Sequence, residues 1–402
     1  MDFDNQAVVE ELTNWGEWYV NTTGVDGFRL DAVKHIKFDF FNKWVKDVEE
    51  RTGKEFGVVA EYLDGDINVI ENYVNKTNGE FDVFDFPLWY RFRDASKGGF
   101  DLRQLFSGSL IARNPEKAVM FVDNHDTQVG KERSEYSVDQ WFKGAAYASI
   151  LTRAGKACVY YGDYFGTNEV EDGYAGVCES ISEELDILLY ARKNYAYGQQ
   201  VDYFNNPDYI GWVRKGDSTH AGSGLATVIA DNKHGGSLRM NVGKEHAGET
   251  WYDITGDIKE TVVIDSKGYA TFSAKGRNDG KCYSVWVPDN SKANTHVGVG
   301  KTQNRIKIYY KGDFQDNAYI MYGAAGTDWT KHPGVQMTDS IYEGYKEISI
   351  DIDNGKQLEF CFTDSYGNWE NYEDKEFSNF VADSPGEYTV INGKLIRDNP
   401  KI

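Results

Sequence analysis

Residues 27–35 read Gly27-Phe28-Arg29-Leu30-Asp31-Ala32-Val33-Lys34-His35, a short stretch that mixes apolar and charged side chains. In an extended strand, Arg29 and Asp31 point to the same side because they are two residues apart. A charge buried without a partner is costly, so the two side chains must pair with each other or meet a ligand. A structural salt bridge at a strand end explains this stretch alone as well as a catalytic pair does.

Two later stretches have the same form, an apolar run that ends in acid. They are Val58-Val59-Ala60-Glu61-Tyr62 and Ala118-Val119-Met120-Phe121-Val122-Asp123-Asn124-His125-Asp126. Three such strands, each followed by a helix-like stretch, predict a (β/α) barrel, in which the chemistry sits at the C-terminal ends of the strands. A single carboxylate after a strand is usually a cap or a surface charge, but three in this arrangement favour a shared active site.

These stretches resemble the second, third and fourth conserved regions of glycoside hydrolase family 13, the α-amylase family. The surrounding sequence resembles the bacterial liquefying members of that family over roughly the first three quarters of the chain. Further matching stretches are residues 15–19, 71–73, 75–78, 83–85, 191–198, 223–226 and 247–251.

The resemblance implies a retaining mechanism with three acidic residues. Asp31 would be the nucleophile, Glu61 the general acid and base, and Asp126 the third acid, which stabilises the oxocarbenium-like transition state. Arg29 beside Asp31 would keep that carboxylate ionised. We expect burial or neighbouring negative charge to raise the pKa of Glu61.

The resemblance also implies contacts to the sugar from Arg29, Lys34, His35 and His125. Lys34 is equally well explained as a solvated charge at a helix start, and a lone histidine such as His125 is more often structural. Leu63 stands where the family commonly has Trp, so stacking on the leaving-group side should be weaker.

Calcium is implied by the resemblance alone, at two places. Calcium takes six to eight oxygen ligands, and most ligands of the first place belong to a segment that this sequence does not contain. For the second place, ordinary exposed turn acids are an equally good explanation. The residues implied are Asp2, Asp4 and the backbone carbonyl of His35 at the first, and Gly98, Phe100, Asp208 and Asp231 at the second.

The predicted fold class is α/β: a partial (β/α)8 TIM barrel holding strands 4–8 only, then an antiparallel β domain C and a small β-sandwich. A helix over residues 1–23 precedes strands at 25–32, 56–61, 81–87, 118–123 and 157–161. Five strands cannot close a normal barrel, and we favour truncation of the reading frame over missing units supplied by another chain. The predicted divisions are 1–198 (barrel), 199–288 (domain C), 289–303 (linker), 304–384 (sandwich) and 385–402 (polar tail).

Residues 318–337 and 360–372 resemble the starch-binding modules of families 25 and 26. We expect Tyr322 and Trp329, then Tyr319, to stack on glucose rings, because flat aromatic faces pair with the apolar faces of sugars. A place in the sandwich core competes with this role, most strongly for Tyr319.

Composition narrows the choice of partner. The chain of 402 residues carries 43 Lys and Arg against 64 Asp and Glu, a net charge of −21, which argues against nucleic acid and anionic membranes. Its four cysteines form no C-x-x-C pair, which predicts free buried thiols.

The sequence shows no signal peptide and no membrane span, and an extracellular location is implied by the resemblance. No oligomeric state is predicted.

The first hypothesis is therefore a retaining α-amylase that cleaves internal α-1,4 bonds of starch, with activity in question because the first barrel units are missing. The alternative from another class is a non-catalytic starch-binding protein. A third is a transglycosylase, because water and a sugar hydroxyl compete for the same intermediate.

Overall fold

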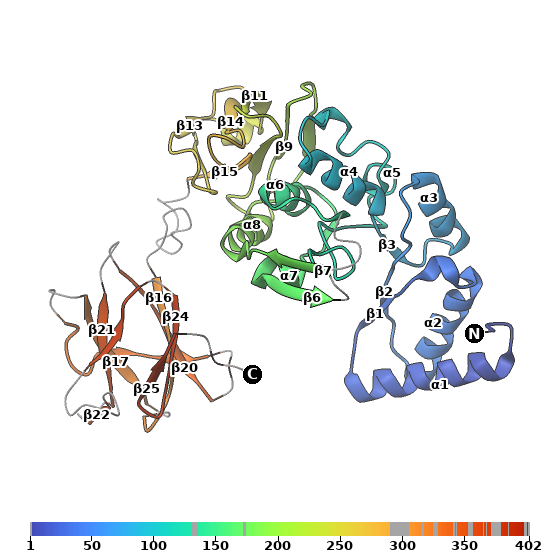
Figure 1. Ribbon diagram of the computed structural model, residues 1–402. Coiled ribbons are helices and arrows are strands. Elements are labelled where there is room, and N and C mark those ends of the chain that lie inside the picture. The colour runs from blue at the N-terminus through green and yellow to red at the C-terminus, as the bar shows by residue number, and fades with distance from the viewer. Residues whose placement is uncertain are drawn as a thin grey trace. The chain divides into compact units, whose positions relative to one another are not determined.

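The computed structural model divides the chain into two compact units, Met1–His296 and Val297–Ile402, which are described separately (Figure 1). The structure describes residues 2–130, 136–171, 174–289, 305–314, 317–324, 329–340, 342, 344–352, 357–364, 366, 368–370, 379–384, 386–397 and 400. The predicted linker 289–303 therefore lies outside the described residues, apart from its first position.

A parallel sheet organises the first part of the N-terminal unit. Within the described residues its order is β1-β2-β3-β4-β5, and every neighbouring pair is parallel. The carboxyl ends of all these strands therefore meet along one edge of the sheet. The strands are β1 Gly27–Leu30, β2 Gly57–Ala60, β3 Asp82–Phe84, β4 Ala118–Met120 and β5 Lys156–Ala157.

Helices follow the strands, as the α/β pattern predicts (Figure 1). The first helix begins where the Asn5 side chain accepts from the Ala7 backbone N–H, and it ends at Gly24, whose φ of 72° suits glycine. The helices are α1 Gln6–Thr23, α2 Phe38–Thr52, α3 Ile67–Lys76, α4 Phe86–Ser96, α5 Leu110–Arg113, α6 Gln140–Leu151, α7 Tyr161–Phe165 and α8 Ser182–Asn194, with a hairpin of β6 Thr167–Glu171 and β7 Tyr174–Cys178 between the last two.

The strand predicted over residues 157–161 is wrong after its first residue. β5 ends at Ala157, and Tyr161 begins α7. The backbone N–H of Tyr160 donates to the hydroxyl of Tyr147 on α6 at 3.2 Å, so a side chain rather than a neighbouring strand satisfies it. An apolar run alone does not distinguish these two partners.

Asp85 joins three segments at the end of β3. Its buried carboxylate caps α4 by accepting from the backbone N–H of Leu88 at 3.1 Å. The same carboxylate accepts from Leu110 at 2.9 Å and Ile111 at 2.7 Å, at the start of α5. One side chain therefore satisfies donors at two helix N-termini.

Replacing Asp85 with alanine is expected to lower the free energy of unfolding by about 2–3 kcal/mol, because three buried N–H groups lose their acceptor. Urea unfolding followed by tryptophan fluorescence measures this. Asp94→Ala, at the exposed end of α4, is the matched control and should cost under about 0.5 kcal/mol. Equal midpoints for Asp85→Ala and the wild type would show that water replaces the carboxylate at no cost.

An antiparallel β region follows, in agreement with the predicted domain C. Its larger sheet has the order β13-β12-β15-β10-β9-β8, and β11 pairs with β14. Trp212, Trp251 and Trp286 are fully buried in it. The strands are β8 Gln200–Tyr203, β9 Tyr209–Arg214, β10 Leu225–Ala230, β11 Gly236–Asn241, β12 Thr250–Asp253, β13 Val262–Val263, β14 Tyr269–Ala274 and β15 Tyr283–Pro288.

The C-terminal unit holds two sheets around a shared core, the arrangement of a small β-sandwich. In the described residues their orders are β19-β20-β16-β24-β25 and β18-β17-β21-β22, with β23 also paired to β21. Ile308 of one sheet and Phe360 of the other belong to the same buried cluster. The strands are β16 Arg305–Lys311, β17 Tyr319–Ala324, β18 Val335–Gln336, β19 Thr338–Asp339, β20 Lys346–Asp351, β21 Leu358–Thr363, β22 Trp369–Glu370, β23 Phe380–Ala382, β24 Gly386–Ile391 and β25 Lys394–Ile396.

The prediction of a polar tail over 385–402 is wrong for residues 386–396. β24 pairs in parallel with β16, and β25 pairs with β24. Tyr388, Thr389 and Val390 are all buried, while Glu387 is exposed. The segment is a strand buried at its centre, and the polar residues Glu387 and Thr389 interrupt the apolar run that would have predicted it.

The four cysteines are free thiols, as predicted; Cys178, Cys282 and Cys361 are buried and Cys158 is partly exposed. Among the described residues, no helix combines the length and apolar character needed to span a bilayer.

Candidate active site

Arg29 and two of the predicted acids form a cluster at the carboxyl ends of β1 and β2. One terminal nitrogen of the Arg29 guanidinium lies 2.7 Å from Asp31 Oδ1, and the other lies 3.2 Å from Glu61 Oε2. A guanidinium is only a few ångströms across, so it holds the two carboxylates close together. The structure therefore contains the Arg29–Asp31 salt bridge, and it also places the carboxylates of Asp31 and Glu61 on the same guanidinium.

The two acids differ in their access to solvent. The side chain of Asp31 is 71 % exposed and that of Glu61 is 7 % exposed. The backbone ladder between the strands extends to Glu61, whose N–H donates to the carbonyl of Leu30 at 2.8 Å. Glu61 is therefore fixed in the sheet, while Asp31 faces open space from the strand end.

Ala32 is a member of this site that the sequence did not reveal. Its φ of 46° lies in the left-handed region, which costs an alanine roughly 1 kcal/mol. In this conformation its backbone N–H donates to Glu61 Oε2 at 2.9 Å. Alanine gives no sequence signal for such a role, because glycine and asparagine are the usual residues there.

Lys34 and His35 lie in a single turn after Ala32, both exposed. Lys34 Nζ donates to the carbonyl of Leu63 at 3.0 Å, so it connects the turn after β1 to the segment after β2. This contact favours a structural role for Lys34 and leaves its predicted contact with sugar as a prediction.

Asp126 and His125 lie after β4, two strands away from β2, which corresponds to about 10 Å at ordinary strand spacing. His125 Nε2 is 3.5 Å from Asp126 Oδ1, and the Asp126 backbone N–H donates to Asn124 Oδ1 at 2.9 Å. Within the described residues, Asp126 makes no hydrogen bond or ion pair with Asp31 or Glu61. The structure thus brings Asp31 and Glu61 together and places Asp126 along the same edge, without direct contact.

A buried ionic cluster supports the segment that carries Asp126. Lys143 on α6 is 1 % exposed and pairs with Asp163 and, at 3.1 Å, with Asp123 Oδ2. Thr127 donates to Asp123 Oδ1 at 2.7 Å, and Tyr147 donates to Asp163 Oδ2 at 2.6 Å. The sequence offered Asp123 only as a strand end, because the lysine is 20 residues away inside an otherwise apolar helix.

Titration of this cluster should make stability depend on pH. Burial, opposed by the charge of Lys143 and assisted by that of Asp163, raises the pKa of Asp123 to about 7. A carboxyl whose pKa is higher in the folded state stabilises the fold at low pH, and this contribution is lost as the pH rises through about 7. The free energy of unfolding of the wild type minus that of Asp123→Asn is therefore expected to fall between pH 4 and pH 7.

Urea titrations at several pH values measure this difference. Asp139→Asn is a matched control, because Asp139 is a half-exposed acid next to α6 and is paired with Lys97. A constant difference between wild type and Asp123→Asn over the whole range would show that Asp123 is ionised throughout.

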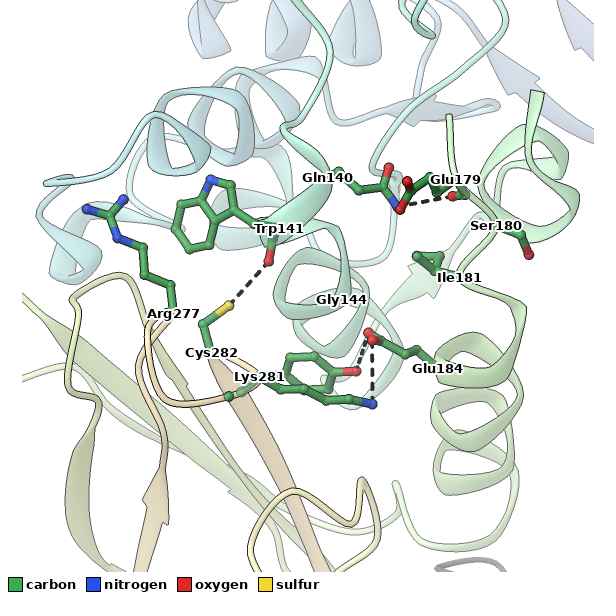
Figure 2. A pocket seen from close by; sticks show the side chains of 12 residues that line it. Gln140, Trp141, Gly144, Glu179, Ser180, Ile181, Glu184, Arg277, Lys281 and Cys282 are labelled. Atoms are coloured by element: carbon green, nitrogen blue, oxygen red, sulfur yellow. Dashed lines mark hydrogen bonds and ion pairs between the residues drawn. The ribbon is translucent and has the colours of Figure 1, made fainter. Parts of the chain in front are cut away.

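A pocket of about 400 Å3 lies apart from these acids, between α6, α8 and β15 (Figure 2). Glu184 there accepts from the Tyr283 hydroxyl at 2.7 Å and pairs with Lys281 at 3.4 Å. The described residues that line it include none of the three predicted catalytic acids. Its lining holds charges of both signs.

Comparison with known proteins places this arrangement in a family. Residues 1–203 match the family described as alpha amylase, catalytic domain, which is half of the chain. The chain belongs to the alpha-amylase family. Residues 225–287 match the alpha-amylase C-terminal domain, in the β region that follows the parallel sheet.

Individual relatives agree with this assignment. The alpha-amylase of Geobacillus stearothermophilus is 49% identical over 298 residues, which are 73% of this chain and 52% of that protein. The alpha-amylase of Bacillus licheniformis is 50% identical over 279 residues, 69% of this chain and 54% of that protein. The chain spans about half the length of these curated alpha-amylase relatives.

The fold agrees as well. A crystal structure of the alpha-amylase from Geobacillus thermoleovorans in complex with acarbose matches 72% of this chain and 65% of its own, with a TM-score of 0.54 at 18% identity. At that identity the match supports an alpha-amylase-like fold, with a catalytic domain and β-rich domains after it.

The carboxylates that the alpha-amylase resemblance implied for the first calcium site have partners within the protein. The Asp4 carboxylate pairs with Lys37 at 2.8 Å, and Asp2 Oδ1 accepts from the Asp4 backbone N–H at 3.0 Å. In the described part of the chain, no group of three or more His, Cys, Asp or Glu side chains is placed to hold a metal ion.

The residues implied for the second calcium site do come together. Asp231 is buried; its Oδ2 accepts from the Phe100 backbone N–H at 2.7 Å, and its own N–H donates to the Asp208 carbonyl at 3.1 Å. Burial raises the pKa of Asp231 to about 6, with the charge of Asp208 acting in the same direction. The exposed Arg277 lies close to Gly98 and partly compensates this negative charge.

The predicted sugar-stacking residues of the C-terminal unit are partly buried. Tyr322 packs against the sandwich core, and the indole of Trp329 occupies the space where Gly323 has no side chain. Tyr319 is also partly buried, which fits its competing role in the core. The sequence analysis missed Trp369, which is 51 % exposed with its ring 6.0 Å from that of His332.

Proposed function

We propose that this chain carries the catalytic carboxylates of a retaining α-amylase that cleaves internal α-1,4 bonds of starch and related α-glucans. The observation that carries the proposal is the Arg29 guanidinium that spans Asp31 and Glu61 at the ends of adjacent parallel strands. In this proposal β1 to β5 are strands 4–8 of a (β/α)8 barrel, and the protein acts outside the cell.

The chemistry follows from two carboxyl groups held close together. Asp31 attacks the anomeric carbon while Glu61 protonates the departing glycosidic oxygen, which gives a covalent glycosyl-enzyme intermediate. Glu61 then takes a proton from water, which attacks the same carbon and releases Asp31. Exposure of Asp31 gives it access to a long polymer, and Arg29 orients both acids throughout.

The remaining predicted residues have supporting roles in this proposal. Asp126 and His125 contact the sugar hydroxyls from the end of β4, and Lys34 and His35 lie on the leaving-group side. A separation of about two strands between Asp126 and Glu61 leaves room for a sugar ring between them.

We also propose that calcium binds at Asp231 and Asp208 together with the carbonyl groups near Gly98 and Phe100. Two carboxylates and nearby carbonyls are hard oxygen donors, which calcium prefers, and burial of the Asp231 carboxylate disfavours its charged form, which a bound cation would stabilise. Bound calcium would hold the catalytic region against domain C.

Chelation should therefore weaken the fold. EDTA is expected to lower the melting temperature of the wild type by several degrees and to leave that of Asp231→Asn unchanged. Differential scanning calorimetry measures both. An equal response to EDTA in the two proteins would place the ion elsewhere.

The second candidate function is starch binding without hydrolysis, through the C-terminal unit. Exposed aromatic side chains favour it, since Trp369 and Tyr366 are 51 % and 87 % exposed. We also keep Tyr322, Trp329 and Tyr319 as proposed stacking residues, although their side chains are partly buried.

One experiment separates the two functions. The purified chain is incubated with soluble starch and, separately, with starch granules. Reducing ends above background support the amylase, and retention on granules without reducing ends supports the binder. Chromatography of the products separates hydrolysis from transglycosylation, which would yield chains longer than the substrate.

A further inference from the structure

A second pocket, of about 660 Å3, has a lining whose charged residues are all cationic. It contains Arg153, which follows α6, Arg192 and Lys193 on α8, and Arg214 at the end of β9. Four cations in one pocket are unexpected in a chain with a net charge of −21. The proposed glucan chemistry does not use any of them.

Only part of this positive charge is neutralised by the protein. Arg153 makes a bidentate pair with Asp202, at 2.7 and 2.9 Å. Arg192 donates instead to neutral carbonyl oxygens, those of Ile150, Leu151 and Gly155. Within the described residues, neither Arg192 nor Arg214 has a carboxylate within 4.0 Å.

Arg214 has the most unused capacity for hydrogen bonding. Its Nε donates to the Gly198 carbonyl at 3.1 Å, and its two terminal nitrogens donate to no acceptor in the part of the chain that the structure describes. A guanidinium presents paired N–H groups that match two oxygens of a carboxylate or phosphate.

The electrostatics of the pocket agree with this geometry. Burial lowers the pKa of Arg192 and of Arg214, and for Arg214 the charges of Arg192 and Arg153 act in the same direction. Asp217 opposes this effect on Arg214, but its carboxylate already binds His220 and Thr219. The cations therefore repel one another in a partly desolvated site, and an anion between them would remove that repulsion.

The pocket of Figure 2 provides an internal comparison. It faces the same domain C and contains Arg277 and Lys281, but Glu179 and Glu184 lie in the same lining (Figure 2). The cationic and anionic side chains of that lining are equal in number. In the second pocket, called the arginine pocket after Arg153, Arg192 and Arg214, the charged side chains are all cationic.

We propose that the arginine pocket is a binding site for a small oxyanion of the phosphate type, held by Arg214 and Arg192 with Lys193 at the rim. A doubly charged oxyanion fits this site better than a single carboxylate, because Arg192, Lys193 and Arg214 have no acidic partner among the described residues. Inorganic phosphate and the phosphate group of a sugar phosphate share this chemistry.

The test uses the full chain and measures melting temperature and, by calorimetry, the dissociation constant for inorganic phosphate. Ionic strength is held constant with sodium chloride, so that screening does not vary. Phosphate is expected to raise the melting temperature of the wild type. Arg214→Gln is expected to weaken binding by at least about 10-fold, because its fork of N–H groups is lost.

Two variants control the result. Arg239→Gln removes an exposed arginine of β11 that pairs with Asp265 at 2.8 Å, and it should bind phosphate as the wild type does. Lys193→Gln, at an exposed position, should weaken binding several-fold even if Arg214→Gln fails to fold. Sulfate, a doubly charged oxyanion of the same shape, should reproduce the effect.

The outcomes are decisive in both directions. No effect of phosphate on the wild type, an equal effect of chloride, or equal binding by wild type and Lys193→Gln would overturn the proposal. Glucose 6-phosphate distinguishes the two sources: tighter binding than inorganic phosphate identifies a sugar phosphate as the ligand, and weaker binding identifies the free anion.

Discussion

Asp31→Asn is expected to lower the release of reducing ends from soluble starch by on the order of 10³-fold or more, because an amide cannot form the glycosyl-enzyme intermediate. The fold should remain intact. Asp31 is 71 % exposed at its side chain, and an asparagine oxygen can still accept from Arg29. The measurement is initial rate at saturating starch, together with the unfolding midpoint in urea.

Asp26→Asn is the matched control for that variant. Asp26 precedes β1 at its opposite end, is 94 % exposed at its side chain and pairs with Lys54 at 2.7 Å. The control should keep the wild-type rate. Equal rates for Asp31→Asn and wild type would mean that the roles assigned to the acids are wrong, even if starch is cleaved.

Lys143→Met is expected to lower the free energy of unfolding by about 3–5 kcal/mol at pH 8, because two buried carboxylates lose their shared cation. The charges of Asp123 and Asp163 outweigh burial and raise the pKa of Lys143, so the wild-type lysine is charged over the whole accessible range. The loss should be smaller at pH 5, where the two acids can take up protons instead. Urea unfolding at both pH values measures it.

Lys156→Met gives the comparison for an exposed ion pair. Lys156 on β5 pairs with Asp82 at 2.7 Å and is 49 % exposed at its side chain, so its loss should cost at most about 1 kcal/mol. A triple variant, Lys143→Met with Asp123→Asn and Asp163→Asn, should recover part of the stability. If Lys143→Met lowers the free energy of unfolding no more than Lys156→Met does, the two carboxylates of the buried cluster are not shielded from water.

The sequence predicted those features that depend on residues close to one another in the chain. Apolar runs located the five parallel strands, and an acid after a strand pointed to Asp31 and Glu61, because parallel strands bring their carboxyl ends to one edge. The meeting of Phe100 with Asp231, 131 residues apart, required the family resemblance as well.

Other features depend on contacts that no local pattern records. The left-handed backbone of Ala32 accompanies its hydrogen bond to Glu61, which lies 29 residues further along the chain. Lys143 contacts Asp123 and Asp163 only after the chain has folded, because these residues lie 20 positions away on either side. The strand 386–391 was missed because Glu387 and Thr389 interrupt its apolar residues, although Thr389 is buried. The positive charge of the arginine pocket comes from three separate segments, and none of them has a sequence pattern that predicts an anion site.

The parallel pairing of β24 with β16 has a consequence for how the C-terminal unit is made. Among the described strands of this unit, β16 is the first and β24 is one of the last. During translation, the backbone groups of β16 that pair with β24 therefore stay unpaired until residue 391 has left the ribosome. A nascent chain in that interval offers a bare strand to chaperones or to neighbouring polypeptides. Expression vectors that trim the sequence before Gly386 would make that temporary state permanent.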